Sequence, residues 1–489
     1  TELEIKYTPN EKNYITNLFI FKNNPNKTTN NLLFNADAIN QNTNTENYTI
    51  YNHFNHTLQL TEKTVLNNYF YLGNDKINEK TNIVSPVLNN FLSINLNEIV
   101  NQNANNKLFF IGNKSKIISK FKKIDLTNTI QLEYSKEQFK NTFLGNNQSF
   151  ASYQNNTNLH LTNLFQENTL RYNFSKKIDL TANLNFQNTI FNNNNISKNI
   201  FFVNPSIFLN IKKTGFGNFS LSFSENNTLP EINQLTTNYQ LTDYRSFLQG
   251  TSYQNPLKNQ TSSFNYSYYN DAKRFSINSS VFYTNSKFIF NTSSNLTNDF
   301  NFNSYIQTKG SESYNFNFSF VNYIRKLKLA SKIETLNNWI TTPINVNSTD
   351  FSNSKSYINS IKYSATTYFK APINFDFGFS YNYFQSYFQG IKTANITKDY
   401  FLNINYKISQ TILAESNNAL YLVNNQTYSF NNIVLSYTPK ESKFSYRFMF
   451  NNLINENQYT YILINNYSYY QSNIQLVPRY LLGTIKYRF

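Results

Sequence analysis

Apolar and polar residues alternate with a period of two over much of this chain, most clearly in its second half. The longest run, INFDFGFSYNY (373–383), places six Ile, Phe and Tyr side chains on one face and Asn, Asp, Gly and Ser on the other. The same alternation occurs in FGNFSLSFS, SSFNYSYY, RFSINSSVFY, SYNFNFSF and KFSYRFMF. A two-residue period is that of a β-strand, whose successive side chains point to opposite faces. The pattern therefore predicts many strands with one aromatic face and one small polar face.

The first 200 residues carry a weaker pattern of the same kind. Plausible strands there are ELEIKY, NLFIF, TIYNHF, NYFYLG, NNFLSINL, TIQLEY, TLRYNF and LTANLNF. Together with the second half they predict about 20–24 strands, and we take about 22 as the central value. No linker or change in composition divides the chain, so residues 1–489 are expected to form a single domain.

A soluble β-sandwich and a transmembrane β-barrel both produce alternating strands. A sandwich has short strands of about 5–6 residues and an outer face rich in charges. Here charged residues are only 14% of the chain while aromatic residues are 17%, and the mean hydropathy is −0.54. A barrel in lipid explains this combination, because its aromatic face meets the membrane while its other face meets water. The fold class predicted is an all-β transmembrane antiparallel barrel in a bacterial outer membrane.

The connections between the predicted strands alternate in length after residue 215. Short links are predicted at 270–273, 323–326, 370–372 and 439–442, and long ones at about 225–260, 286–301, 338–354, 385–397 and 451–476. Outer-membrane barrels have short periplasmic turns and longer extracellular loops. The alternation therefore predicts that the final strand descends towards the periplasm and that residues 451–476 lie outside the cell.

The charge and the absence of cysteine exclude several classes of protein. The net charge is +16, but Lys and Arg are spread thinly, with KSKIISKFKK (114–123) as the only dense run, which disfavours nucleic-acid binding. Anionic lipid headgroups or surface polysaccharide are better partners for scattered basic residues. With no cysteine, disulfides and thiolate metal sites are excluded. No apolar run is long enough for a transmembrane helix.

Catalytic and metal-binding patterns are not found in the sequence. His53 and His56 are three residues apart, so a strand would point them to opposite faces, and His160 is remote from both. No nucleophile elbow, zinc-binding helix, phosphate loop or dinucleotide fingerprint occurs. We expect no enzyme activity, no cofactor and no metal, and we expect Asp376 and Arg447 to face the lumen.

Two segments resemble the barrels of TonB-dependent receptors and cover about a fifth of the chain. In the first, a strand runs into a segment in which Pro is followed five residues later by Leu, and then into a turn similar to Gly-Asn-Pro-x-Leu, although residues 251–254 separate the Gly from the Asn. The second is similar to the end of the family, with a Tyr-rich loop and a last strand closing on Phe. The matching residues are Pro230, Leu235, Asp243, Gly250, Pro256 and Leu257, and then Asn452, Leu453, Asn455, Pro478, Arg479 and Phe489. The abundance of Asn and the single Trp resemble the SusC-like type of Bacteroidetes.

This resemblance implies import of a bulky nutrient such as a glycan, a peptide or a metal chelate. It also implies lipopolysaccharide, a SusD-like lipoprotein, TonB and the barrel-assembly machinery as partners. Leu481, Ile485, Tyr487 and Phe489 in the last strand resemble the signal that this machinery reads. Family members carry an N-terminal plug, and because the chain reads as strand from its start, we expect this sequence to be the barrel portion. The alternatives are a plugless structural subunit of a larger outer-membrane complex and a passive porin.

Tyr-rich outer loops are the candidate sites for a ligand or partner. Tyrosine offers an apolar ring and a hydroxyl, while Asn offers both a donor and an acceptor, so such loops suit sugars or peptides. The candidate residues are Tyr239, Tyr244, Tyr253, Tyr467, Tyr469 and Tyr470. Loops that are merely exposed to solvent, with no partner, explain the same residues equally well.

Overall fold

The computed structural model describes residues 1–34, 37–146, 148–194, 196–213, 215–251, 255–348, 350–423, 426–464 and 469–488. Its strands up to residue 228 are β1 (Glu2–Asn10), β2 (Asn13–Phe34), β3 (Asp37–Thr61), β4 (Thr64–Val84), β5 (Val100–Lys120), β6 (Ile124–Gly145), β7 (Gln148–Ser149), β8 (Asn155–Ser175), β9 (Ile178–Asn193), β10 (Ile196–Lys213) and β11 (Gly217–Thr228). Three short helices, α1 (Pro86–Phe91), η1 (Ala151–Tyr153) and η2 (Ile232–Leu235), lie in the connections. None of the helices described is long and apolar enough to cross a membrane.

The remaining strands continue the same sheet, apart from one separate hairpin. They are β12 (Gln240–Asp243), β13 (Ser246–Gln249), β14 (Leu257–Asn270), β15 (Phe275–Leu296), β16 (Asn301–Ile324), β17 (Leu329–Val346), β18 (Ser352–Thr367), β19 (Ile373–Phe388), β20 (Ile391–Lys407), β21 (Ile412–Val423), β22 (Gln426–Tyr437), β23 (Phe444–Asn451), β24 (Gln458–Ile464), β25 (Tyr469–Gln475) and β26 (Tyr480–Tyr487). Strands β24 and β25 form a two-stranded sheet of their own, and the others form one sheet of 24 strands.

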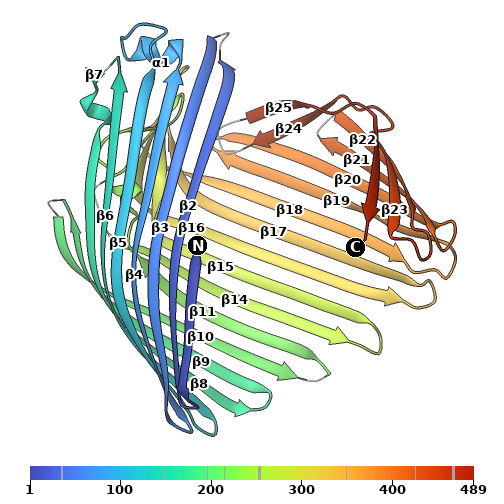
Figure 1. The fold of residues 1–489 in the computed structure, drawn as a ribbon, viewed down its shortest axis with the longest axis horizontal. Helices are drawn as coiled ribbons and strands as arrows, with labels where there is room; N and C mark the ends of the chain where they lie inside the picture. Colours follow the sequence, from blue (N-terminus) through green and yellow to red (C-terminus); the bar gives the residue numbers. More distant parts are fainter. Residues whose placement is uncertain are drawn as a thin grey trace.

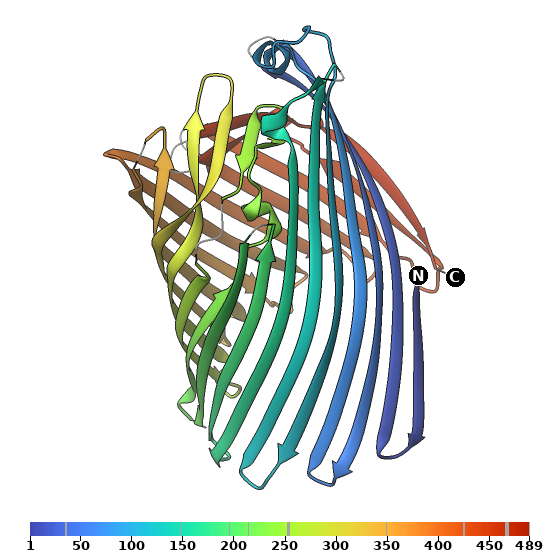
Figure 2. The ribbon, with the colours of Figure 1, turned by 90° about the vertical axis from the view of Figure 1, so that its left-hand side faces the viewer.

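The large sheet is an antiparallel meander, as the alternating pattern predicts. Apart from the short strands β7, β12 and β13, each strand pairs with the next along the chain, from β1 through to β26. The sheet curls so that β1 to β9 form one wall and β14 to β22 face them across a trough (Figures 1 and 2). No pairing between β1 and β26 is found among the described residues. The structure thus shows a large curled sheet, and closure into a barrel stays a prediction.

The strand registers gather the predicted aromatic faces on one side of the sheet. Leu221 lies opposite Phe264, Phe264 opposite Val281, and Val281 opposite Phe316. We call this the outer face of the sheet. The opposite face, onto which the connection between β11 and β14 folds, is the inner face (Figure 2). Along each strand the two faces alternate, because a strand has a side-chain period of two.

Apolar residues occupy only part of the outer face. In β6, every second residue from Ile124 to Tyr134 points outward, and all of these side chains except Asn128 are apolar or aromatic. The next outward residues are polar or charged: Lys136, Gln138 and Lys140. Ten residues of strand extend about 33 Å, and a tilt of about 45° reduces this to about 25 Å of height. This apolar band lies beside the short hairpin turns that follow β1, β3, β5, β8 and the corresponding later strands. We call that edge of the sheet the turn end and the opposite edge the loop end.

The predicted short turns are confirmed, while three of the five predicted long loops are wrong. Strands β15 and β16 pair as far as Leu296 and Asn301, so residues 286–301 are mostly strand. Residues 338–354 and 385–397 are likewise mostly strand. The polar residues there suggested loops, but each extended segment has a neighbour to pair with, and pairing overrides the weak strand propensity of Asn and Ser.

The segment NNFLSINL, predicted as a strand, is wrong in a different way. Helix α1 begins before it, with Ser85 as the N-cap accepting a hydrogen bond from the Leu88 N–H at 3.3 Å and Pro86 in the first turn. The Asn89 side chain then donates to the Asn95, Leu96 and Glu98 carbonyls at 2.8–2.9 Å, which closes a compact loop. The Ser-Pro pair is a helix-start signal that the sequence interpretation missed.

Candidate functional site

The connection between β11 and β14 turns into the trough and lies on the inner face of the sheet (Figure 2). We call it the inner loop, residues 229–256, of which 252–254 lie outside the described residues. It contains η2, β12 and β13, and β13 adds itself in parallel to β16, pairing Ser246–Gln249 with Asn301–Ser304. The loop therefore belongs to the packed structure of the trough.

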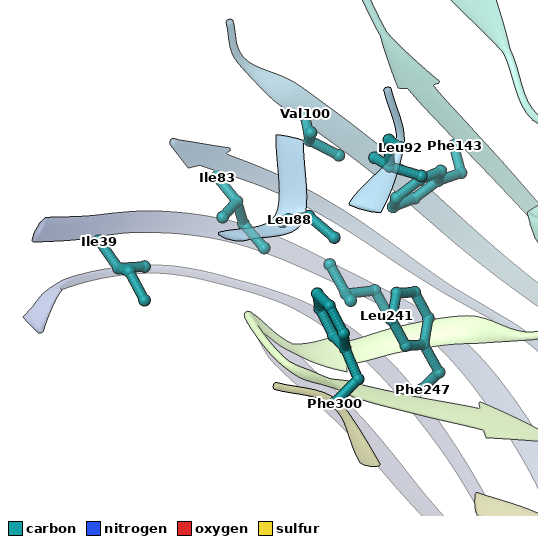
Figure 3. Packing of buried hydrophobic residues seen from close by; sticks show 9 residues of the cluster. All are labelled: Ile39, Ile83, Leu88, Leu92, Val100, Phe143, Leu241, Phe247 and Phe300. Atoms are coloured by element: carbon teal, nitrogen blue, oxygen red, sulfur yellow. The ribbon is translucent and has the colours of Figure 1, made fainter. Parts of the chain in front are cut away.

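Buried side chains from the strands and the inner loop hold it there. Ile39, Ile83, Val100 and Phe143 project from β3, β4, β5 and β6 towards the loop (Figure 3). Leu241 and Phe247 of the loop meet them, together with Leu88, Leu92 and Phe300. Phe247 is completely buried and stacks on Phe302 with the ring centroids 5.1 Å apart and the planes inclined by 6°. This cluster is the main apolar core at the loop end.

Two polar side chains fix the backbone of the inner loop to the wall. Gln102 donates to the Leu241 carbonyl at 2.7 Å and accepts from the Leu241 N–H at 2.9 Å. Asn155 makes the same pair of bonds with Asn238, at 3.0 and 2.9 Å. Each side-chain amide thus bonds both the N–H and the C=O of one loop residue, as a neighbouring strand would. These backbone groups would otherwise be buried without a partner.

The structure places two of the predicted ligand tyrosines within this packing. Tyr239 is half-buried, with its ring 5.5 Å from that of Phe302, and Tyr244 meets the Phe34 ring edge-on at 6.0 Å. Burial, with a contribution from Tyr239, raises the pKa of the nearby Tyr153 phenol and keeps it neutral. Tyr239 and Tyr244 contribute to the trough's internal surface, and their role towards a ligand stays a prediction.

The other predicted residues are less fully described. Tyr253, Tyr467 and Phe489 lie outside the described residues, whereas Tyr469 and Tyr470 belong to β25. Three residues of the predicted assembly signal lie on the outer face of β26, where they are exposed: Leu481, Ile485 and Tyr487.

A cavity of about 780 Å³ lies against the inner face between β10 and β18. Its lining includes a row of side chains that register places side by side across neighbouring strands: Ser220, Asn265, Ser280, Asn317, Leu336 and Ser360. All of these side chains except Leu336 are polar, and we call the five polar ones the polar row. Asn265 donates to Ser220 at 3.4 Å, and Asn317 donates to Ser280 at 3.3 Å.

Charges of both signs border the polar row. Lys212, Glu334 and Lys362 also line the cavity, and Glu334 pairs with Lys332 at 2.8 Å. Lys212 lies 3.9 Å from Asp179. A wall of amides and hydroxyls with a few charges can bind the hydroxyls of a sugar or the backbone of a peptide. The sequence pattern placed Ser220, Asn265 and Asn317 on the polar faces of their strands, but it gave no sign that these faces would line a cavity.

A second inner-face group lies on β3 to β6. The Tyr51 and Tyr69 hydroxyls bond to each other, and His53 packs on the Tyr69 ring with the centroids 5.0 Å apart. Tyr71 donates to the Glu133 carboxylate two strands away and accepts from Gln131 at 2.8 Å. His53 and His56 point to opposite faces, as expected, and among the described residues no group of three or more His, Cys, Asp or Glu is placed to hold a metal.

The charged residues expected in the lumen do lie on the inner face. Asp376 accepts from Thr366 at 2.9 Å and from Asn403 at 3.4 Å. Arg447 stands in register between Ser436 and Thr484, on the face opposite Phe448. Their orientation is therefore confirmed by strand register.

Comparison with known proteins supports the fold alone. Neither a family model nor a curated protein matches the sequence. Among solved structures, the copper transporter OprC is similar over 86% of this chain, which spans 66% of the OprC chain, with 8% identity and a TM-score of 0.54. The siderophore receptor PirA from Pseudomonas aeruginosa matches at 10% identity over 100% of this chain and 80% of its own, with a TM-score of 0.38. The FrpB iron transporter from Neisseria meningitidis matches at 12% identity over 100% and 82%, with a TM-score of 0.44. These neighbours are receptors and transporters rather than enzymes, and this chain shares the overall fold of the copper transporter.

Proposed function

We propose that this chain is the barrel portion of a bacterial outer-membrane receptor that imports a bulky nutrient by TonB-dependent transport. The observation that carries the proposal is the pairing of an apolar band on the outer face with a polar inner face that holds a folded loop. A sheet of this kind needs lipid on one side and water on the other. The likeness in fold to a copper transporter agrees with it.

The finer proposal concerns closure, orientation and partners. We place the turn end in the periplasm and the loop end outside the cell, with about 22 strands closing the barrel, as in the barrels that such receptors use. The Pro230 and Asn452 segments support the TonB-dependent family, while the abundance of Asn and the single Trp support its SusC-like type. Such a receptor would act with a SusD-like lipoprotein and TonB and lie in lipopolysaccharide. The nutrient class that best fits the polar row is a glycan or a peptide, and a metal chelate is the third candidate.

Substituting the polar row tests the transport role. Asn265→Leu with Asn317→Leu is expected to lower uptake of the nutrient about thirtyfold, since each of the two lost hydrogen bonds costs about 1 kcal/mol. The measurement is uptake per molecule of protein in the outer membrane, in cells that depend on this gene. Asn113→Leu is the matched control, because Asn113 lies on the outer face between Phe70 and Leu132. Equal uptake by all variants would remove the polar row from the transport path.

Two other functions predict different outcomes in the same cells. A passive pore gives a large steady conductance when the full-length protein is inserted into planar bilayers. A structural subunit copurifies in fixed ratio with other outer-membrane proteins, and deletion leaves uptake unchanged. A gated import receptor shows neither result.

Deleting Phe489 tests the proposed assembly signal. We expect a strong fall in the amount of folded protein in the outer membrane, with degradation products in the periplasm, because the assembly machinery reads the end of β26. Immunoblots of membrane and periplasmic fractions measure this outcome. Phe121→Ala, a loss of one exposed aromatic ring in a turn, serves as the control. Normal membrane levels after the deletion would rule out Phe489 as part of the signal.

A further inference from the structure

Basic residues are concentrated in the turns at one end of the sheet. The turn-end connections carry fourteen Lys and Arg residues, namely Lys12, Lys63, Lys122, Lys123, Lys176, Lys177, Lys273, Arg274, Arg325, Lys326, Lys328, Lys370, Lys440 and Lys443. The same connections hold four acidic residues, Glu11, Glu62, Asp271 and Glu441. We call the fourteen the basic ring. The sequence interpretation that Lys and Arg are thinly spread is wrong in three dimensions, because hairpins bring distant turns to one rim.

The loop end has the opposite balance. Its connections hold six acidic residues, Glu98, Glu231, Asp243, Asp299, Asp350 and Glu456, against two basic ones, Arg245 and Arg479. Charges that served only solubility would mix both signs at both ends. The segregation therefore indicates an anionic partner at the turn end.

The basic ring is free to meet such a partner. All but Lys328 are exposed, and Lys328 is half-buried. No carboxylate of the described residues lies within 4.0 Å of any of the fourteen side chains. Three of them have uncharged partners in the protein. Arg274 lies over the Tyr323 ring at 5.2 Å, and Lys443 lies over the Tyr487 ring at 5.7 Å. Arg325 donates a hydrogen bond to the Ala272 carbonyl. None of these partners is an anion, so an anion with several oxygens would gain from the basic ring.

The apolar band beside the ring identifies the kind of anion. In β6 the outward apolar residues start at Ile124, directly after the turn that holds Lys122 and Lys123. Exposed aromatic rings lie at the same level, with Phe121 53%, Phe174 50%, Tyr269 68% and Tyr368 56% exposed. Aromatic residues and long basic side chains occur together where hydrocarbon gives way to lipid headgroups. A nucleic acid would not require the adjoining apolar band.

We propose that the basic ring binds the phosphates of anionic phospholipid headgroups in the leaflet that surrounds the turn end. This inference rests on the membrane position in the proposed function, but it does not depend on what the protein transports. The headgroup phosphates lie level with the turns, while the acyl chains cover the apolar band above them. Lipid of this charge would anchor the turn end at a fixed depth, and the acidic loop end would not share this attraction.

The test uses the full chain in neutral detergent, titrated with short-chain phosphatidylglycerol and with phosphatidylcholine of the same chain length. We expect salt-sensitive binding of phosphatidylglycerol and much weaker binding of phosphatidylcholine. The variant K122Q/K123Q/K176Q/K177Q is expected to bind phosphatidylglycerol at least about tenfold more weakly, because each lysine that is neutralised removes its attraction to a headgroup. Replacing the same four lysines with arginine keeps the charge and should retain binding.

The matched control neutralises four exposed lysines near the loop end, K27Q/K80Q/K140Q/K392Q, and should leave binding unchanged. An equal loss in this control would overturn the assignment to the turn end. If inorganic phosphate displaces the lipid at equal concentration, the ring is a general anion site and the lipid assignment fails. Tighter binding of a single-stranded oligonucleotide than of phosphatidylglycerol would also overturn it. Nutrient uptake by K122Q/K123Q/K176Q/K177Q is measured separately from lipid binding. A failure of the transport proposal can therefore be distinguished from a failure of the lipid-binding proposal.

Discussion

Replacing Phe247 with alanine is expected to detach the inner loop from the wall of the trough. The side chain is completely buried among rings and aliphatic side chains from the strands, the inner loop and α1. Truncating such a residue costs about 3–5 kcal/mol, because transfer energy is lost and a cavity is left. We expect a lower thermal unfolding midpoint and rapid proteolysis within residues 229–256, measured on the folded protein in detergent.

The control is Phe121→Ala, which removes the same ring from an exposed turn. It is expected to leave the proteolysis of residues 229–256 unchanged, because Phe121 lies at the turn end and makes no contact with the described residues of the inner loop. If the Phe247→Ala variant unfolds at the same temperature as the parent protein and its inner loop resists protease, the apolar core around Phe247 does not hold the loop. The amide bonds from Gln102 and Asn155 would then be the main attachment.

We expect the inner loop to influence what the trough can bind. It joins the β3–β6 wall to β16, so a change in the loop alters the space between two parts of the sheet. A ligand that contacts both the loop and the polar row would therefore be sensitive to whether the loop is attached. Detachment by Phe247→Ala is expected to change ligand affinity even though Phe247 itself is buried.

Local alternation was enough to predict the faces of most strands. The aromatic sides of FGNFSLSFS and SSFNYSYY meet in register, because side chains alternate between two faces and the pairing aligns the aromatic faces of both strands. The same reasoning placed Asp376 and Arg447 on the inner face. Features that depend on the period of a single strand could be read directly from the sequence.

Features that depend on distant residues could not be read in this way. Gln102 and Leu241, which bond to each other, are 139 positions apart, and no local pattern connects them. The inner loop has the composition of an exposed loop, since its burial follows from strand curvature that places β6 and β16 on either side of it. The basic ring was hidden for a related reason, because turns far apart in sequence become neighbours only after the meander forms.

Introducing a methyl group at Gly112 is expected to break the contact between Tyr71 and Glu133. Gly112 stands between these two residues in register, and the Tyr71 ring passes over it to reach the carboxylate. A Cβ at this position would lie less than 3.0 Å from atoms of that ring. Gly112→Ala should displace the ring, forfeit its bonds to Glu133 and Gln131, and destabilise the protein by about 2–4 kcal/mol.

A double-mutant cycle in thermal or denaturant unfolding separates the clash from other effects of the substitution. With Tyr71 already replaced by alanine, no ring crosses position 112, so Gly112→Ala is expected to cost little in that background. Gly483→Ala is the matched control, because its Cβ would meet only Phe448 at an ordinary 3.8 Å. If Gly112→Ala costs the same with and without the Tyr71 ring, the glycine serves the backbone alone. A cost that disappears with the ring shows that the glycine is there to let Tyr71 reach Glu133 across β5.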